Sequence, residues 1–279
     1  MRNINVNEIR KTVSRLCIQA NTKLRPDILA ALKKALRKEK NALARKILKE
    51  LIENARIAAR ENLAICQDTG MVVVFLDMGE DVHIAGGGLY DAVNNGVKDG
   101  YAKGCLRKSV ADPLTRKNTK TNAPSVIYTE ITAGNKLKIR VIPKGFGSEN
   151  KSRIKMFNPT AGIRDIKEFI ADTVKKAGAD ACPPLVLGVG IGGTMDKAAE
   201  LAKLACLCPV NKHNPKRHIR TLEIELLREI NKLGIGPMGL GGKTTALGVN
   251  ILEYPTHIAG LPVAVNISCH ATRSASAII

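Results

Sequence analysis

The sequence predicts a mixed α/β protein, because helical and strand patterns follow one another along its 279 residues. Apolar side chains recur at helical spacing over the first 64 residues, whereas buried-strand runs such as residues 71–76 (MVVVFL) begin after residue 70. No repeat, low-complexity stretch or linker interrupts this pattern. We therefore expect one domain over residues 1–279, in which a helical segment (1–64) packs on a mixed α/β part (65–279).

The first segment predicts three helices. Ile9, Val13 and Leu16 form one apolar stripe. Pro26 begins a second helix, at an early position where its missing N–H costs little. A third stripe continues over residues 43–62. Because each helix has one apolar face, the segment is interpreted as a helical packing unit.

Strands and helices are expected to alternate after residue 70. Residues 125–131 and 136–142 flank a glycine-containing turn at Gly134, and this arrangement predicts a β-hairpin. The remaining expected elements are strands over residues 71–76, 185–189 and 261–267, and helices from Leu89 and over residues 162–176, 194–207 and 221–233.

The composition narrows the classes of partner. The chain carries 44 Lys and Arg against 25 Asp and Glu, a formal net charge of +19. Aromatic residues make up only 3% of the sequence, which removes the stacking platforms that single-strand nucleic-acid binding uses. The charge therefore favours an anionic substrate or an acidic partner protein. No apolar run has the length of a membrane span and residues 1–8 lack a signal-peptide core, so we expect a cytoplasmic protein.

Three of the seven cysteines carry most of the functional information. Cys66, Cys182 and Cys269 lie far apart in the chain, each in a turn-like context, and none belongs to a C-x-x-C pair. Three thiolates that the fold brings together can ligate three irons of a [4Fe–4S] cluster and leave the fourth iron open as a Lewis acid. Cys17 and Cys105 are interpreted as small apolar residues.

Two glycine-rich segments partly match nucleotide-binding motifs. Residues 188–193 match G-x-G-x-x-G, but no acidic residue and no second parallel strand follow about 20 residues later. We interpret them as a glycine turn that lets the backbone approach some ligand. Residues 239–244 resemble a P-loop, but Pro237 occupies the position of its first glycine, so we expect no ATP or GTP binding there.

A different metal site is an alternative. Cys206, Cys208, His213 and His218 form a C-x-C…H-x4-H array that could bind zinc, in a zinc- or nucleic-acid-binding protein. C-x-C spacing is poor geometry for two ligands of one tetrahedron. The simpler interpretation is a buried cysteine pair at a helix end followed by a basic loop.

Five segments together resemble the iron–sulfur-dependent class I fumarase family. They are residues 66–70 (CQDTG), 143–151 (PKGFGSENK), 187–194 (LGVGIGGT), 234–242 (GIGPMGLGG) and 269–273 (CHATR). The chain is similar to a separate alpha subunit of that family over nearly its whole length. The related L-tartrate dehydratase alpha subunit shares the same cluster-binding plan and remains the close alternative.

The resemblance implies a reversible hydration of fumarate to L-malate. It also implies that Cys66, Cys182 and Cys269 hold a [4Fe–4S] cluster with one open iron, to which a small dicarboxylate binds. A beta subunit would supply further active-site residues, in an α2β2 assembly, and this chain alone would be nearly inactive.

The resemblance and the chemistry of dicarboxylates suggest further site residues. Gln67 and Asp68 follow the first ligand directly, and His257 would pair with Asp68 for proton transfer. Arg107 is expected to bind a carboxylate, because guanidinium does so bidentately. Backbone N–H groups at Gly145 and Gly147 would bind substrate, and Lys151 and Arg273 are alternative carboxylate partners.

Overall fold

A computed structural model describes all 279 residues of the chain, which divides into two compact units. Unit 1 consists of Met1–Arg25, Ala55–Phe146 and Arg273–Ile279, and unit 2 consists of Pro26–Asn54 and Gly147–Thr272. The mixed α/β class is confirmed. None of the helices combines the length and apolar composition needed to cross a membrane.

The three predicted helices are present, but the boundaries of the two compact units do not fall at residue 64. The helices are α1 (Val6–Thr22), α2 (Pro26–Lys38) and α3 (Ala42–Glu61). Helix α1 belongs to unit 1, α2 belongs to unit 2, and α3 passes from one to the other. Helical periodicity shows that a helix has a buried face, but it contains no information about which surface covers that face.

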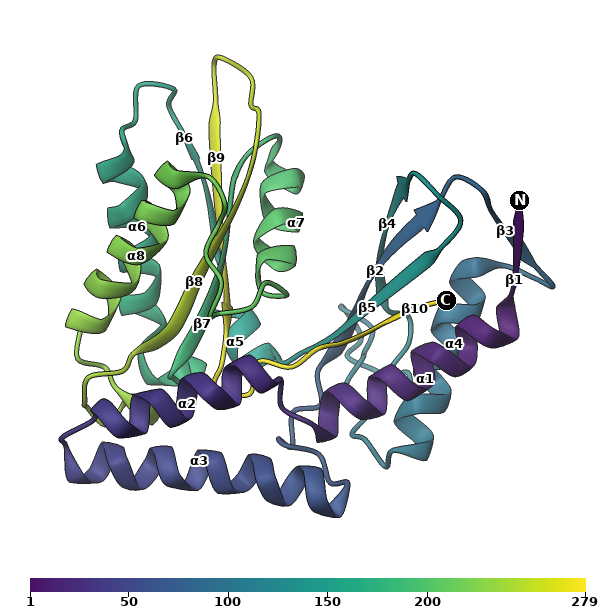
Figure 1. Cartoon of the computed structure of the whole chain (residues 1–279), viewed down its shortest axis with the longest axis horizontal. Coiled ribbons are helices and arrows are strands. Elements are labelled where there is room, and N and C mark those ends of the chain that lie inside the picture. Colours follow the sequence, from purple (N-terminus) through teal and green to yellow (C-terminus); the bar gives the residue numbers. More distant parts are fainter. The chain divides into compact units, whose positions relative to one another are not determined.

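Unit 1 is built on a four-stranded sheet with the order β10-β5-β2-β4. These strands are β2 (Met71–Gly79), β4 (Val126–Thr132), β5 (Leu137–Lys144) and β10 (Ala275–Ile278). Helices α1 and α4 (Leu89–Lys103) pack on one face of this sheet and enclose its core (Figure 1). A small parallel pair, β1 (Arg2–Asn5) and β3 (Val82–Ala85), completes the unit.

The predicted hairpin is wrong. Strands β4 and β5 do not pair with each other, because β2 lies between them, parallel to β4 and antiparallel to β5. The run that forms β2 is apolar on both sides, and such a strand takes a central place in a sheet. A turn signal between two strands therefore identified a reversal of the chain but not the pairing partner.

Helices α1 and α4 approach each other closely through glycine. A Cβ atom at Gly96 would lie 2.7 Å from the Arg10 carbonyl oxygen, and one at Gly100 would lie 2.8 Å from that of Ser14. Any side chain at these two positions would push the helices apart. The close contact leaves the long polar side chains of both helices side by side on the outer surface.

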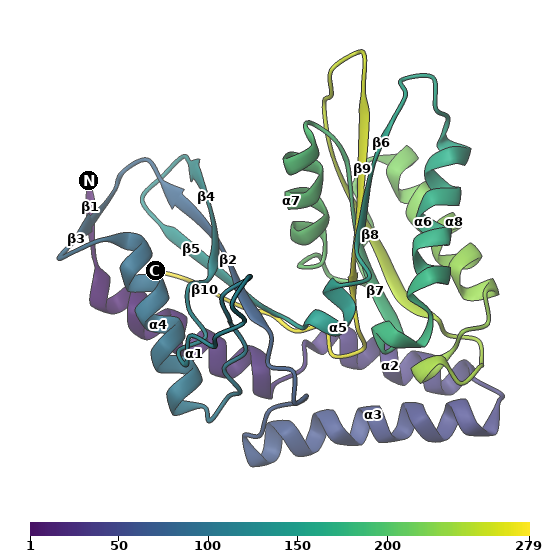
Figure 2. The same ribbon diagram turned by 180° about the vertical axis from the view of Figure 1, so that it is seen from behind.

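Unit 2 contains a sheet with the order β6-β9-β7-β8. The strands are β6 (Arg153–Phe157), β7 (Leu185–Gly192), β8 (Ala246–Tyr254) and β9 (Leu261–Ser268). Helices α6 (Ile163–Ala177) and α8 (Arg217–Lys232) cover one face, and α7 (Met195–Ala205) covers the other (Figure 2). Short helical turns lie at α5 (Phe146–Glu149), η1 (Gly178–Ala181) and η2 (Pro237–Gly239).

The glycines of residues 188–193 serve helix packing, so their interpretation as a ligand-approach turn is wrong. Gly188 and Gly190 lie inside β7, on the side that faces α7. A Cβ atom there would come within 2.1 Å of the Ala202 carbonyl oxygen and 2.0 Å of the Ala198 carbonyl oxygen, respectively. The backbone of α7, not a ligand, occupies the space that these glycines leave open.

Gly190→Ala should therefore lower the free energy of unfolding by about 1–3 kcal/mol, the usual cost of overpacking a rigid core. The strand and helix backbones must separate to accept the new methyl group. Urea unfolding followed by circular dichroism measures the change. Gly260→Ala is the matched control, since a Cβ there meets no atom within 4 Å. Equal stability of the two variants would contradict the packing role.

Candidate functional site

One edge of the unit 2 sheet brings Cys182 and Cys269 together. Cys182 precedes β7 and Cys269 follows β9, and these strands are antiparallel with Val186 opposite Ser268. The backbone N–H of His270 donates to the Cys182 carbonyl oxygen at 3.2 Å. Both cysteines are partly exposed and no cysteine forms a disulfide. Two of the three predicted cluster ligands are thus neighbours.

The His270 ring also contacts this connection. Its Nδ1 atom lies 3.1 Å from the same carbonyl oxygen, and a carbonyl can only accept, so Nδ1 is the protonated nitrogen in this contact. Cys182 has a left-handed backbone conformation (φ 53°), which a non-glycine residue adopts only when its surroundings hold it there. The two hydrogen bonds from His270 provide part of that restraint.

The glycine-rich segment 234–242 lies at the same edge. Strand β8 runs parallel to β7, so the residues before both strands are neighbours. The N–H of Met238 donates to the Pro183 carbonyl oxygen at 2.8 Å. Gly239 has φ +77° and a Cβ there would lie 2.2 Å from the Ala179 side chain, so only glycine fits. Two of the five predicted motifs, residues 234–242 and 269–273, therefore meet beside Cys182.

In unit 1, backbone donors hold the carboxylate of Asp68. Oδ1 accepts a hydrogen bond from the N–H of Gly70 at 3.0 Å, and Oδ2 accepts one from the N–H of Phe146 at 2.7 Å. Phe146 lies between Gly145 and Gly147, whose N–H groups are predicted to bind substrate, and its own amide is directed to Asp68. Nearby, the Cys66 thiol donates to the Gln67 side-chain oxygen at 3.4 Å.

Glycine is required where this turn meets Asp68. A Cβ atom at Gly145 would lie 3.1 Å from Oδ2 of Asp68 and 3.6 Å from Nη2 of Arg273. A side chain there would disturb both charged groups. A Cβ at Gly147 would meet only the Asp180 carbonyl oxygen, at 3.8 Å, so this second glycine has no comparable steric reason.

Arg273 is a buried cation beside Asp68. Its side chain is 4% exposed, although guanidinium is rarely buried without an anion. Nη2 donates to the Asp68 carbonyl oxygen and Nε donates to the Pro143 carbonyl oxygen at 3.3 Å. The third nitrogen, Nη1, is buried and has no hydrogen-bond partner. Leaving a buried N–H group without an acceptor costs free energy, and an anion at Nη1 would remove that cost. Arg273 is therefore chemically suited to bind an anion.

The other two cations that the sequence suggested lie in different environments. Lys151 forms an ion pair with Asp180 at 2.7 Å. Arg107 is exposed, and its backbone carbonyl oxygen accepts a hydrogen bond from the Thr69 hydroxyl at 2.5 Å. The latter contact places Arg107 next to the segment that contains Asp68. Lys151 already has an anionic partner, whereas Nη1 of Arg273 does not.

His257 lies at the opposite end of the unit 2 sheet from the two cysteines. It follows β8, whose last residue, Tyr254, pairs with the last residue of β7. The length of β7 therefore separates it from Cys182, about 25 Å for eight residues. The exposed His257 ring accepts the N–H of Ala259 at 3.2 Å. Its pairing with Asp68 remains a prediction.

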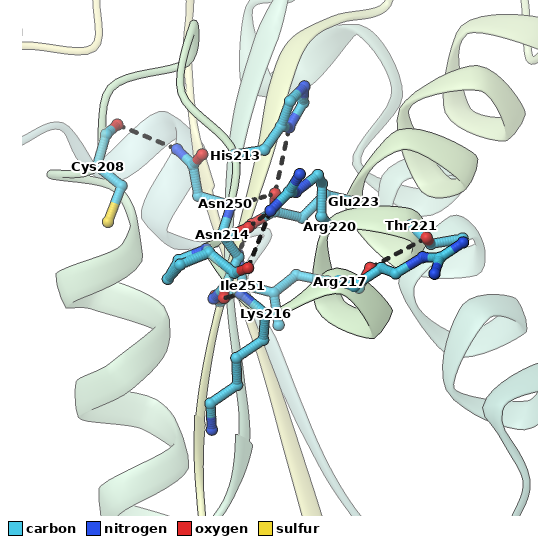
Figure 3. Close-up of polar contacts among 11 residues, drawn as sticks. Cys208, His213, Asn214, Lys216, Arg217, Arg220, Thr221, Glu223, Asn250 and Ile251 are labelled. Atoms are coloured by element: carbon cyan, nitrogen blue, oxygen red, sulfur yellow. Dashed lines mark hydrogen bonds and ion pairs between the residues drawn. The ribbon is translucent and has the colours of Figure 1, made fainter.

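The alternative zinc ligands do not converge. Cys206 is 3% exposed and its thiol points to the Ala202 carbonyl oxygen at 3.6 Å. His213 directs Nδ1 to the buried carboxylate of Glu223 at 3.2 Å, and Figure 3 shows Cys208 well apart from that ring. Cys206, Cys208, His213 and His218 contribute to no group of three His, Cys, Asp or Glu side chains arranged to hold a metal ion. The zinc hypothesis is therefore not supported by the arrangement of its own ligands.

The Glu223 carboxylate holds the loop before α8 in place. Besides His213, it accepts hydrogen bonds from the N–H groups of Asn214 at 3.0 Å and Ile251 at 2.9 Å (Figure 3). The Asn214 amide in turn donates to the Ile251 carbonyl oxygen at 2.9 Å. The segment before α8 is thus fastened to β8 by a buried carboxylate, a structural role for residues that looked like a metal array.

A buried network that the sequence did not suggest fastens the second motif to β9. Glu149 accepts from the Lys203 ammonium group and, at 2.9 Å, from the Asn266 side chain. The Ser152 hydroxyl accepts from the N–H of Ile267 at 3.1 Å. These contacts hold the strand that leads to Cys269. Glu149 and Lys203 are distant in sequence, and no local pattern connects them.

The P-loop-like segment is also held by a carboxylate. The N–H of Lys243 donates to Oε2 of the buried Glu39 at 2.6 Å. Glu39 also accepts from the N–H groups of Lys40 and Asn41. Burial raises the pKa of Glu39, but these backbone hydrogen bonds outweigh it and hold the pKa below its ordinary value. An amide that a phosphate would need is therefore already used.

Comparisons with known proteins agree with this arrangement of motifs. The profile of the family described as "Fumarate hydratase (Fumerase)" matches residues 10–278. A protein of Methanocaldococcus jannaschii, named provisionally as L(+)-tartrate dehydratase subunit alpha, is 41% identical over 96% of both chains. The L(+)-tartrate dehydratase subunit alpha of Escherichia coli K12 is 28% identical over 98% of this chain and 91% of its own.

The fold and the matched motifs define a hydro-lyase, an enzyme that adds or removes water. Within that class, the chain belongs to the fumarate hydratase (Fumerase) family. The match extends through both structural units and includes all five motifs.

Glu39 should make stability depend on pH in the acid range. Its pKa is lowered in the folded state, so its contribution is fully present above the pKa of the unfolded state, about 4.3, and is lost as the pH falls through the folded pKa. Glu39→Gln should flatten the stability profile below about pH 5. Thermal unfolding between pH 3 and 7 measures this. An equally steep profile in the variant would contradict the assignment, and Glu50→Gln, on an exposed helix face, is the control.

Proposed function

We propose that the chain is the alpha subunit of a [4Fe–4S]-dependent hydro-lyase that acts on a small dicarboxylate. Cys66, Cys182 and Cys269 would hold the cluster. The observation that carries this proposal is the meeting of Cys182 and Cys269 at one sheet edge, joined by the His270 hydrogen bonds. Neither a core cysteine nor a disulfide cysteine needs such an arrangement.

The donor chemistry fits the cluster. Thiolates are the usual ligands of [4Fe–4S] clusters, and Cys182 and Cys269 are both partly exposed. The other cysteines differ: burial raises the pKa of Cys17 to about 12, so that thiol stays protonated. The unpartnered Nη1 of Arg273, four residues after Cys269, is a suitable donor to an anionic group.

The residues of unit 1 would bind and orient the substrate. When bound, the cluster supplies an open iron that acts as a Lewis acid toward a hydroxyl or carboxylate oxygen. The Asp68 carboxylate would accept a proton from the substrate and return it. Two backbone N–H groups already orient this carboxylate. Arg273 and Arg107 would bind a carboxylate, and Gln67 would contact the substrate beside Cys66.

The identity of the dicarboxylate has two candidates. The family description favours fumarate and its hydration to L-malate. The names of the relatives favour L(+)-tartrate, whose dehydration gives oxaloacetate, and at 41% identity this second candidate is at least as well supported. Both substrates have two carboxylates and require the same loss or gain of water.

A second polypeptide would complete the enzyme. The relatives are named alpha subunits, so a beta subunit is expected, with an α2β2 assembly as the simplest stoichiometry. The basic charge of +19 would favour an acidic beta subunit and an anionic substrate. The assembled enzyme would act in the cytoplasm, without contact with nucleic acid.

Cluster content tests the proposal directly. The chain purified without oxygen should contain about four irons and four sulfides. Cys66→Ser, Cys182→Ser and Cys269→Ser should each lose most of this iron, because each removes one of three thiolate ligands. Cys105→Ser, at an exposed position, is the matched control and should retain it. Zinc without iron in the wild-type chain would contradict the proposal. With the beta subunit added, turnover of fumarate and of L(+)-tartrate identifies the substrate.

Arg273→Lys tests the substrate-binding role. Lysine keeps the charge but cannot reach two carbonyl oxygens and an anion at once. A lost hydrogen bond to a charged group costs about 1.5–3 kcal/mol, so KM for the dicarboxylate should rise about 10- to 100-fold in the assembled enzyme. Iron content and circular dichroism should stay unchanged. Lys151→Arg, at an ion-paired surface position, is the control. An unaltered KM would remove Arg273 from the substrate site.

A further inference from the structure

Unit 1 contains an open cavity of about 680 Å³ along α1, lined mainly by charged and polar residues and bordered by the last turns of α4 and by Asn62. It lies on the side of α1 opposite to the stripe of Ile9, Val13 and Leu16 that packs in the core. None of the residues of the five motifs lines it. The established hydro-lyase class and the proposed cluster therefore leave this cavity unexplained.

The cavity is strongly cationic. Five of its lining residues are basic, Arg10, Lys11, Arg15, Lys23 and Lys103, and one is acidic, Asp99. Asp99 is neutralised by Arg10 through two hydrogen bonds, of 2.7 and 3.0 Å. The hydrogen bond from Arg10 also lowers the pKa of Asp99. The carboxylate is therefore committed, and the cavity has a net charge of about +4.

Three of these cations have no anionic partner in the protein. Lys11 and Arg15 lie one turn apart on α1, Lys23 directly follows its last residue, and none of the three forms an ion pair. Lys103 adds a fourth charge from α4, on the neighbouring side of the cavity. Like charges held this close repel one another, and a bound anion would relieve that repulsion. The close packing of α4 on α1 at Gly96 and Gly100 fixes this grouping.

The cavity also offers hydroxyl groups to a ligand. Ser14 and Thr22 both line it, two turns apart on α1. The Thr22 hydroxyl already donates to the Ile18 carbonyl oxygen at 3.0 Å. The Ser14 hydroxyl is not among the buried polar atoms that lack a partner, and its place in the lining allows it to donate to a ligand oxygen.

We propose that this cavity binds a small multivalent oxyanion, a polyphosphate or a polycarboxylate. Ile18 is the one apolar lining residue and no aromatic side chain is present, so a nucleotide base would find no stacking partner. The remaining lining residues include Asn7, Gln19 and Asn62, whose amide groups donate to oxygen. Cations on both helices would bind the ligand, with Ser14 at the floor.

Binding would stabilise unit 1. The ligand would join α1 to α4 across their outer surface, while the opposite face of α1 packs on β5 and β10. Strand β10 begins two residues after Arg273, so α1 supports the segment that contains the buried guanidinium. The proposal is independent of the cluster and of the beta subunit, and it can fail or hold without them.

Isothermal titration of the full chain with sodium tripolyphosphate, and separately with citrate, tests the proposal at low ionic strength. Wild type should bind one equivalent of at least one of these anions, and the tighter one distinguishes polyphosphate from polycarboxylate. The double variant Lys11→Gln/Arg15→Gln should bind at least about tenfold more weakly, since charged hydrogen bonds contribute about 1.5–3 kcal/mol each. Ser14→Ala should bind about fivefold more weakly, the usual effect of one neutral hydrogen bond.

Lys33→Gln/Lys34→Gln is the matched control. These two exposed lysines of α2 belong to unit 2 and do not line the cavity. Their replacement removes the same charge, so the affinity should change by no more than about twofold. Absence of saturable binding by the wild-type chain would overturn the proposal. Equal weakening by the control and the cavity variants would also overturn it, because the interaction would then reflect only the overall charge. Circular dichroism confirms that each variant is folded.

Discussion

The directions of three neighbouring strands determine where the candidate site of unit 2 can form. Because β9 is antiparallel to β7 and β8 is parallel to it, the end of β9 and the starts of β7 and β8 meet at one edge. Cys269, Cys182 and the glycine segment before β8 are consequently neighbours, although the two cysteines are 87 positions apart in the chain. Strand ends carry function in many α/β proteins because the sheet is rigid and the loops beyond it are available.

Glycine has three different roles here, and only the structure distinguishes them. Gly190 admits a helix backbone against a strand, Gly239 allows a left-handed turn beside η1, and Gly145 keeps space next to Asp68 and Arg273. The motif G-x-G-x-x-G looks the same in a sequence whether a phosphate or a helix approaches it. The absent acidic residue further along argued against a dinucleotide site, but it did not identify α7 as the element packed on these glycines.

Buried charge links the motifs that define the family. Arg273 joins the segment after the third cysteine to the carbonyl groups of Asp68 and Pro143, so parts of the first, second and last motifs share one guanidinium. In unit 2, Glu149 connects the second motif to β9 through Asn266. A buried charged group that loses a hydrogen-bond partner in a low-dielectric interior is costly. A substitution in one motif would therefore destabilise the motifs that it contacts. The unpartnered Nη1 atom is the exception that indicates a ligand.

The sequence by itself determined the class of the fold, most helices and buried strands, the family and the three candidate cluster cysteines. Those features depend on periodicity, turn chemistry and motif spacing, which are local properties. Tertiary structure alone decided that β2 separates β4 from β5, that α1 and α2 belong to different units, and that Arg273 is buried while Lys151 is paired with Asp180. It also decided that His257 lies at the opposite end of the sheet from Cys182. Pairing partners and buried charges depend on contacts between segments far apart in the chain, and no local pattern specifies them.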